Sequence, residues 1–285
     1  MKKLFPPPVT FNQALVKAIS GIGDEATANV YTAAFPDPET IESGYAVSAR
    51  AGALYAAPRV LGTADPVIVG TLRKSHLTKL YGQYFVPAGK PARELYDAIK
   101  VGAQGKCPLC GGIGHVRTLD HYLPKANFPL YSVLPSNLVP CCRDCNSEKL
   151  NAFSTDEPNQ TLHPYFDHDR FFTQKWISAR VIPTDPPVVE FFVSPPDDWS
   201  LTEKSRVRAH FSEYDLAAKF SVEAGADIPE TLQTRRTTMA ANTPEEFSAY
   251  LAEKGRTDTL PINNWRRVMF SALAEDAWFC AEQFT

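Results

Sequence analysis

The chain has 285 residues, 44% of them hydrophobic and 21% charged, a composition that excludes a long disordered or low-complexity protein. This length is enough for one large domain or for two to three small ones. The net charge of −3 argues against a protein that coats nucleic acid without specificity, because such binding depends on neutralising many phosphates.

The N-terminal stretch does not resemble an export signal. It carries two lysines, but Pro6–Pro8 interrupt the apolar segment that a signal peptide needs. Further along the chain, no apolar run reaches the roughly 18–20 residues that span a bilayer. We therefore expect a cytoplasmic protein with no membrane partner.

Residues 1–100 are predicted to form a mainly helical N-terminal region. Alanine-rich stretches with apolar positions three to four residues apart predict helices over Phe11–Ser20, Asp24–Ala34 and Glu39–Ala56. Another helix is expected over Pro91–Val101, because proline suits the first helical position, where a missing N–H costs no hydrogen bond.

The central region, residues 101–170, has tight Gly and Pro turns and shorter apolar runs. Val116–Leu119 and Leu130–Leu134 are predicted to be strands, and Arg143–Ala152 a helix, in the order strand, loop, strand, helix. Residues 171–285 are predicted to form an α+β C-terminal region.

In the C-terminal region, two β-branched and apolar runs, Trp176–Ile182 and Val188–Val193, flank a proline-containing turn and predict a pair of strands. Amphipathic patterns predict helices over Thr202–Ala226 and Asn263–Gln283. The whole chain is therefore expected to be α+β, with a mainly helical N-terminal region and an α+β C-terminal region around a small centre.

Five of the six cysteines fall within the centre, between positions 107 and 145. Cys107-Pro-Leu-Cys110 and Cys142-Arg-Asp-Cys145 form two C-x-x-C pairs, and a pair of that spacing on a tight turn can bind one tetrahedral ion. In a chain without an export signal, this pattern favours a structural Zn²⁺ site over disulfides. Cys141 could replace Cys142, but the two intervening residues of Cys142 and Cys145 match the first pair.

Polar residues of a particular order lie between and beside these pairs. The segments are Leu119-Asp120-His121-Tyr122-Leu123-Pro124-Lys125, then Asn137-Leu138, then Asn146 and Lys149 directly after the last cysteine. The order C-x-x-C, D-H-x-x-P, N-L, C-x-x-C-N-x-x-K resembles the zinc-knuckle branch of the HNH (ββα-metal) endonuclease family. The resemblance covers about 45 residues and implies a small ββα-metal core with a four-cysteine zinc site.

Phosphodiester hydrolysis needs a base for water and a cation that offsets charge on the phosphate. His121 is the candidate base, because an imidazole can be neutral near pH 7. Asp120, on the other side of an extended strand, and Asn146 are candidate oxygen ligands for Mg²⁺ or Mn²⁺. By resemblance, Asn137 braces the loop that orients His121. Lys149, one turn beyond Asn146, is expected to contact phosphate.

One position departs from the commoner family pattern. Many HNH proteins carry a third histidine in the closing helix, where this chain has Asn146. Asparagine also occurs there among active members, so the difference changes a ligand and leaves the site intact. Lys125 and Arg143 are further candidates for phosphate contacts, and the role of His163 stays open.

The sequence therefore predicts a metal-dependent endonuclease that hydrolyses DNA, and the resemblance suggests bacterial defence or a mobile element as its setting. The expected partners are a DNA substrate and either a regulatory protein or a second copy of the chain. Two alternatives remain: a zinc-stapled module that binds nucleic acid or protein without catalysis, and an RNA-cleaving toxin with the same core.

Overall fold

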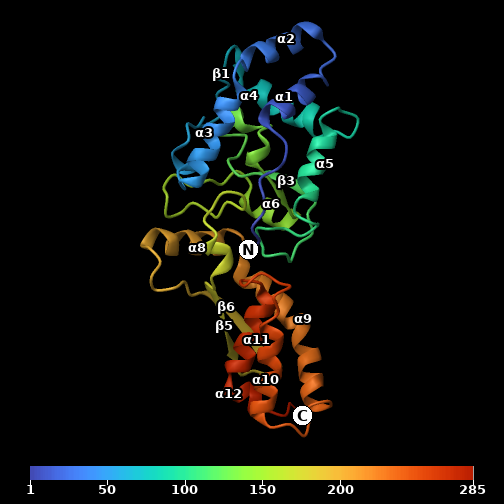
Figure 1. Ribbon diagram of the computed structural model, residues 1–285, viewed down its shortest axis with the longest axis vertical. Coiled ribbons are helices and arrows are strands. Elements are labelled where there is room, and N and C mark those ends of the chain that lie inside the picture. Colours follow the sequence, from blue (N-terminus) through green and yellow to red (C-terminus); the bar gives the residue numbers. More distant parts are fainter. Residues whose placement is uncertain (285) are drawn as a thin grey trace.

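A computed structural model describes residues 1–284 and confirms the α+β fold. The helices are α1 (Phe11–Ile19), α2 (Glu25–Ala34), α3 (Pro38–Arg50), α4 (Lys74–Lys79), α5 (Arg93–Val101), α6 (Arg143–Lys149), α7 (Arg170–Thr173), α8 (Leu201–Glu213), α9 (Leu216–Arg236), α10 (Pro244–Gly255), α11 (Trp265–Glu275) and α12 (Ala277–Ala281). The strands are β1 (Val67–Val69), β2 (Leu72–Arg73), β3 (Thr118–His121), β4 (Leu138–Cys141), β5 (Ile177–Ile182) and β6 (Val188–Val193). They pair into three antiparallel two-stranded sheets. Figure 1 shows an elongated molecule, with the N-terminal and central elements at one end and α9 to α12 at the other.

Side-chain caps fix where the N-terminal helices begin. Thr10 caps α1 in a capping box with Gln13, whose side chain accepts a hydrogen bond from the Thr10 N–H at 2.9 Å. Asp24 and Asp37 cap α2 and α3 by accepting from the backbone N–H three residues later. These caps explain why the first three helices begin within a residue of their predicted starts.

Two helix predictions in this region need correction. The helix expected over Glu39–Ala56 ends at Arg50, because Gly52 adopts a φ of 68°, which an α-helix cannot contain. The helix expected over Pro91–Val101 begins at Arg93, so the proline precedes the helix instead of occupying its first position.

The central region contains the expected order of strand, strand and helix. β3 and β4 pair in antiparallel register, from Thr118 opposite Cys141 to His121 opposite Leu138. The helix α6 follows β4 after a single residue and packs against β3. This arrangement brings the end of β3 and the polar face of α6 together.

The second predicted strand was placed on the wrong segment. Leu130–Leu134 is a run of tight turns, in which the Ser132 N–H and hydroxyl both donate to the carbonyl of Pro129. The actual strand β4 contains Pro140, which cannot donate a hydrogen bond and therefore weakened the strand pattern. Hydrophobicity alone could not distinguish the two short runs.

In the C-terminal region the predicted pair of strands, β5 and β6, is confirmed. The single helix expected over Thr202–Ala226 is two helices, because Asp215 adopts a left-handed conformation between α8 and α9. The helix expected over Asn263–Gln283 also divides, since Asp276 is extended and caps α12 by accepting from the Phe279 N–H. The sequence analysis did not predict α10, which begins with a capping box at Thr243.

The N-terminal helices pack onto the centre, and Tyr45 of α3 donates a hydrogen bond to the side-chain oxygen of Asn137 at 2.9 Å. A buried ion pair joins α8 to the centre, with Arg206 Nη1 at 2.7 Å from Asp167 Oδ1. The elements β5, β6, α9 and α11 pack against one another.

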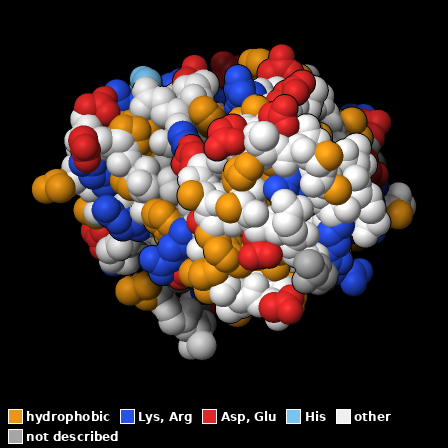
Figure 2. Space-filling view, turned by 90° about the horizontal axis from the view of Figure 1, so that it is seen from below, with side chains coloured by type: hydrophobic (Ala, Val, Ile, Leu, Met, Phe, Trp, Pro, Cys, Tyr) orange, Lys and Arg blue, Asp and Glu red, His pale blue; other side chains and the backbone are white. Residues whose placement is uncertain are grey.

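On the face seen in Figure 2, acidic and basic side chains are interspersed, as the near-neutral net charge leads one to expect. Among the described residues, no helix combines the length and the hydrophobicity that crossing a membrane requires.

Candidate metal centre and active-site cleft

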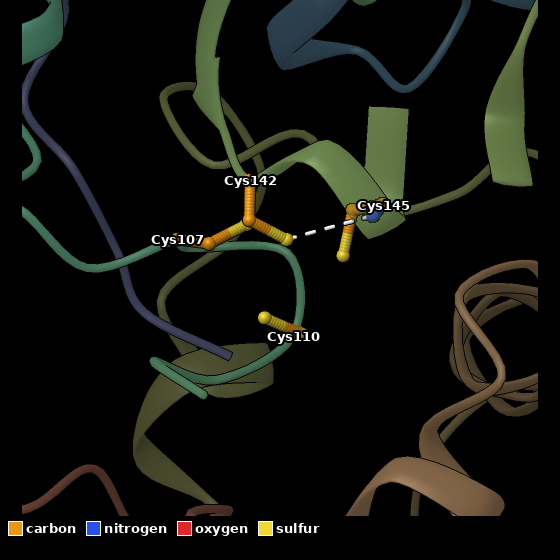
Figure 3. A group of neighbouring side chains, drawn as sticks. All are labelled: Cys107, Cys110, Cys142 and Cys145. Atoms are coloured by element: carbon orange, nitrogen blue, oxygen red, sulfur yellow. Dashed lines mark hydrogen bonds between the residues drawn. The ribbon is translucent and has the colours of Figure 1, made fainter. Parts of the chain in front are cut away.

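Four cysteine sulfurs converge where the loop before β3 meets the start of α6 (Figure 3). Cys107, Cys110, Cys142 and Cys145 are buried, and their Sγ atoms all lie within 4.8 Å of one another. In a tetrahedral shell with zinc–sulfur bonds of about 2.3 Å, neighbouring sulfurs lie about 3.8 Å apart. The two C-x-x-C pairs therefore form one donor set that can hold a metal ion such as zinc.

The backbone around the first pair is shaped to bring the sulfurs together. Gly111 and Gly112 have positive φ angles, of 67° and 96°, which glycine adopts without strain. A Cβ at Gly114 would lie 2.5 Å from both the Cβ and the Sγ of Cys142, so only glycine fits there. The Gly114 N–H also donates to the Sγ of Cys110 at 3.3 Å, which favours a thiolate.

Cys141 is buried but does not belong to the four-sulfur group. It is the last residue of β4, whereas Cys142 caps α6 and its Sγ accepts from the Cys145 N–H at 3.5 Å (Figure 3). The choice of Cys142 over Cys141, made from spacing alone, therefore agrees with the structure.

A polar cleft of about 290 Å³ opens beside this centre. Its lining includes three of the predicted site residues, Asp120 and His121 from the end of β3 and Asn146 from α6. Lys125 and Tyr81 also line it, with the Lys125 amine 5.5 Å from the centre of the Tyr81 ring. The structure thus brings together predicted site residues that lie up to 26 positions apart in the sequence.

His121 is held in one orientation. Its Nε2 lies 2.8 Å from the carbonyl oxygen of Ser132, and a carbonyl can only accept, so Nε2 carries the proton of the neutral ring. The Tyr81 ring packs edge-on against the imidazole at 4.4 Å. Burial, together with the nearby Lys125 charge, lowers the pKa of His121 to about 3. The ring is therefore neutral near pH 7, with Nδ1 as its proton acceptor.

Asp120 is paired with a buried cation. Its Oδ2 lies 3.0 Å from the Lys149 amine, and the same amine donates to the backbone oxygen of His121 at 2.6 Å. Burial raises the pKa of Asp120 above its usual value, and Lys149 opposes that shift. Lys149 was expected to contact phosphate. In this structure its amine points to Asp120 and is buried, with only 4% of the residue exposed.

Asn137 braces the loop between the two strands, as predicted by resemblance. Its fully buried side chain accepts from the Leu123 N–H at 2.8 Å and donates to the carbonyls of Leu123 and Tyr131, at 3.0 and 3.2 Å. Tyr131 directly precedes Ser132, whose carbonyl holds the ring of His121. One hydrogen bond of Asn137 therefore ends at the residue next to the one whose carbonyl holds the His121 ring.

The helix α6 links the two centres, although it has only seven residues. Its N-cap Cys142 and its buried Cys145 contribute to the sulfur group, Asn146 lines the cleft, and Lys149 reaches Asp120. Any ion bound by the four sulfurs would therefore hold in place the helix that completes the cleft.

Sequence reasoning missed several residues that shape this site. Tyr81 comes from a π-helical segment, Leu80–Phe85, far from the motifs, and Ser132 contributes only its backbone oxygen. Neither position carries a signal that spacing could reveal. His163 is buried, 3.3 Å from the Tyr45 hydroxyl, within an aromatic cluster behind the cleft, and we assign it no chemical role.

No known protein-family model matches this chain, and no solved structure matches it. It is similar to a protein named ea31 from Escherichia phage lambda. The two are 34% identical over 293 residues, which cover 98% of this chain and 99% of the lambda protein. The similarity therefore extends beyond the central region to both flanking regions.

Proposed function

This chain belongs to the family of the phage lambda protein ea31, and we propose that it is a metal-dependent endonuclease of the HNH type that hydrolyses phosphodiester bonds in DNA. The proposal rests on one observation above the others. Asp120, His121 and Asn146, singled out by their order in the sequence, line a single polar cleft beside a four-cysteine centre.

The orientation of His121 suits a general base. With Nε2 bonded to Ser132, the unprotonated Nδ1 is the atom that can take a proton from water. The water oxygen would then attack phosphorus, and the bond from phosphorus to the leaving oxygen would break. The leaving oxygen would take a proton from solvent, which leaves one phosphate end and one hydroxyl end. The lowered pKa of His121 keeps the imidazole unprotonated at neutral pH, so that Nδ1 has a free lone pair.

Asp120 and Asn146 offer a carboxylate and an amide oxygen to the cleft, a set that suits Mg²⁺ or Mn²⁺ with several waters retained. Such an ion would supply the positive charge that stabilises the phosphate in the transition state. Lys149 contacts one carboxylate oxygen of Asp120, Oδ2 at 3.0 Å, and its amine also hydrogen-bonds the backbone oxygen of His121.

The four-cysteine centre would have a structural part in this proposal. Four cysteine ligands close a tetrahedral shell, so an ion held there has no open position for substrate. Zinc would therefore fix the loop before β3 to α6 and leave the chemistry to the neighbouring cleft. The bacteriophage origin of the lambda relative supports a setting in a mobile element.

The test is cleavage of plasmid, single-stranded DNA and RNA by the purified chain with Mg²⁺ or Mn²⁺. We expect DNA cleavage that His121→Ala abolishes, with zinc content and melting temperature retained. His115→Ala is the matched control, because His115 is an exposed histidine of the same region. Cleavage that survives His121→Ala would refute the proposed base, and cleavage of RNA alone would refute the proposed substrate.

A further inference from the structure

The chain leaves α6 through a tight turn that carries an unusual residue. The Ala152 N–H donates to the carbonyl of Lys149 at 2.7 Å, closing a four-residue turn around Leu150 and Asn151. Leu150 has φ 47° and ψ −113°, close to the values of the first central residue of a type II′ turn. Glycine dominates that position, because a Cβ makes the conformation costly.

The presence of leucine in this costly backbone conformation needs an explanation. A residue other than glycine in a sparsely populated backbone region destabilises the fold, and such residues cluster at functional sites. Glycine at position 150 would make the same turn without that cost. We infer that position 150 requires the leucine side chain itself.

The side chain of Leu150 makes little use of the protein interior. Leu150 is 70% exposed, although it follows a helix whose Cys145 and Lys149 are buried. It lines the cleft that contains Asp120, His121 and Asn146. A single exposed leucine is ordinary on a protein surface, but one held in a strained turn at the edge of a polar cleft is not.

We propose that Leu150 is a wedge that enters duplex DNA at the base step next to the scissile phosphate. This inference rests on the proposed nuclease function and names the form of its substrate. Proteins that distort DNA insert apolar side chains, leucine among them, between base steps. The polar cleft would hold the phosphate while the leucine beside it contacts the bases.

The neighbouring side chains fit the same partner. Lys125 also lines the cleft and can face a phosphate, and Asn151 beside the leucine can bond to base or sugar atoms. Duplex DNA presents negatively charged phosphates and apolar base faces a few ångströms apart. The phosphates would face Lys125, and the base faces would contact Leu150. A protein partner would have no reason to require the metal-binding side chains nearby.

Two substitutions at this position separate the side chain from the backbone. Leu150→Ala removes the wedge but keeps the strained φ, whereas Leu150→Gly removes both. Leu150→Ala should leave the melting temperature nearly unchanged and lower kcat/KM on duplex DNA at least about tenfold. Leu150→Gly should lower kcat/KM similarly while raising the melting temperature by about 2–4 °C. Leu201→Ala is the control, because Leu201 is a leucine that is 84% exposed on α8.

Insertion itself can be measured without cleavage. In a His121→Ala background, duplexes with 2-aminopurine at successive positions should show a fluorescence increase on binding at one base step. Leu150→Ala should remove that increase while most of the binding remains. Equal kcat/KM and equal fluorescence for Leu150→Ala and the parent protein would overturn the wedge and leave the nuclease proposal standing. If the protein binds and cuts no duplex DNA, the wedge and the nuclease proposal both fail.

Discussion

The amine of Lys149 lies 3.0 Å from Oδ2 of Asp120, and both side chains are almost fully buried. This buried ion pair affects both the stability of the protein and the position of the His121 backbone. Removing one partner leaves an uncompensated charge in the protein interior, whereas removing both can cost little. The amine also bonds the backbone oxygen of His121, so one amine holds the Asp120 side chain and the His121 backbone together.

Lys149→Met should therefore destabilise the protein by about 3–5 kcal/mol, measured by urea unfolding. The double variant Asp120→Asn/Lys149→Met should recover most of that loss, because neither charge remains. Lys17→Met is the control: Lys17 pairs with Glu94 at an exposed position, so its loss should change stability by less than about 1 kcal/mol. Additive losses in the double variant would contradict the pairing.

Replacing one of the four clustered cysteines should have a different effect from replacing the neighbouring Cys141. Cys142→Ala should lower bound zinc and disorder the central region, because the sulfur group loses a donor. Cys141→Ala removes an equally buried thiol outside the group and should keep full zinc content. Atomic absorption and far-ultraviolet circular dichroism report both effects. Equal zinc loss in the two variants would mean that the sulfur group is wrongly assigned.

Asn137→Ala should destabilise the loop between β3 and β4 by about 3 kcal/mol or more. The substitution leaves the Leu123 N–H and two backbone carbonyls without their partner, and each unsatisfied buried group costs about 1–3 kcal/mol. We also expect DNA cleavage to fall beyond what the lost folded fraction explains, since Ser132 would no longer hold His121. Cleavage per folded molecule at the parent rate would count against the bracing role.

Acid should destabilise the protein through its buried histidines. Burial lowers the pKa of His210 to about 3, and in the unfolded chain a histidine protonates near pH 6.5. Between these values the unfolded state binds more protons, so stability falls as the pH drops from about 6.5 toward 3. The loss reaches up to about 1.4 kcal/mol per pH unit for each such histidine.

Urea unfolding at a series of pH values measures this slope. His210→Gln should flatten it, because glutamine takes up no proton, and the exposed His115→Gln should not. An unchanged slope in His210→Gln would show that the folded and unfolded states protonate this residue alike.

If Lys125 contacts phosphate, Lys125→Met should weaken DNA binding uniformly across sequences. It should also reduce the slope of log K against log salt concentration by about 1, the change expected for one lost phosphate contact. Lys149→Met should leave that slope unchanged, because its amine is buried against Asp120. Fluorescence anisotropy at several salt concentrations distinguishes the two lysines.

The sequence predicted which residues come together better than it predicted the secondary structure around them. The spacing of the C-x-x-C pairs identified the sulfur group, and the D-H and C-N segments identified the residues that line the cleft. Both predictions depend on residue type and local spacing. The second strand was misplaced because β4 contains Pro140, and no local pattern marks it as paired with β3.

The ion pair of Lys149 was not predictable for a related reason. Its position on the face of Asn146 was predictable, but its direction depends on Asp120, which lies 29 residues earlier. The helix breaks at Asp215 and Asp276 were also invisible to periodicity, because apolar residues continue on both sides. These features come from tertiary contacts that hydrophobic patterning does not record.

The seven residues of α6 give the two centres a thermodynamic linkage. A chelator that strips the thiolate-bound ion would release Asn146 and Lys149 along with the cysteines, so affinity for a hard divalent cation should collapse in the same step. Oxidants that join these thiols into disulfides should lower that affinity as well.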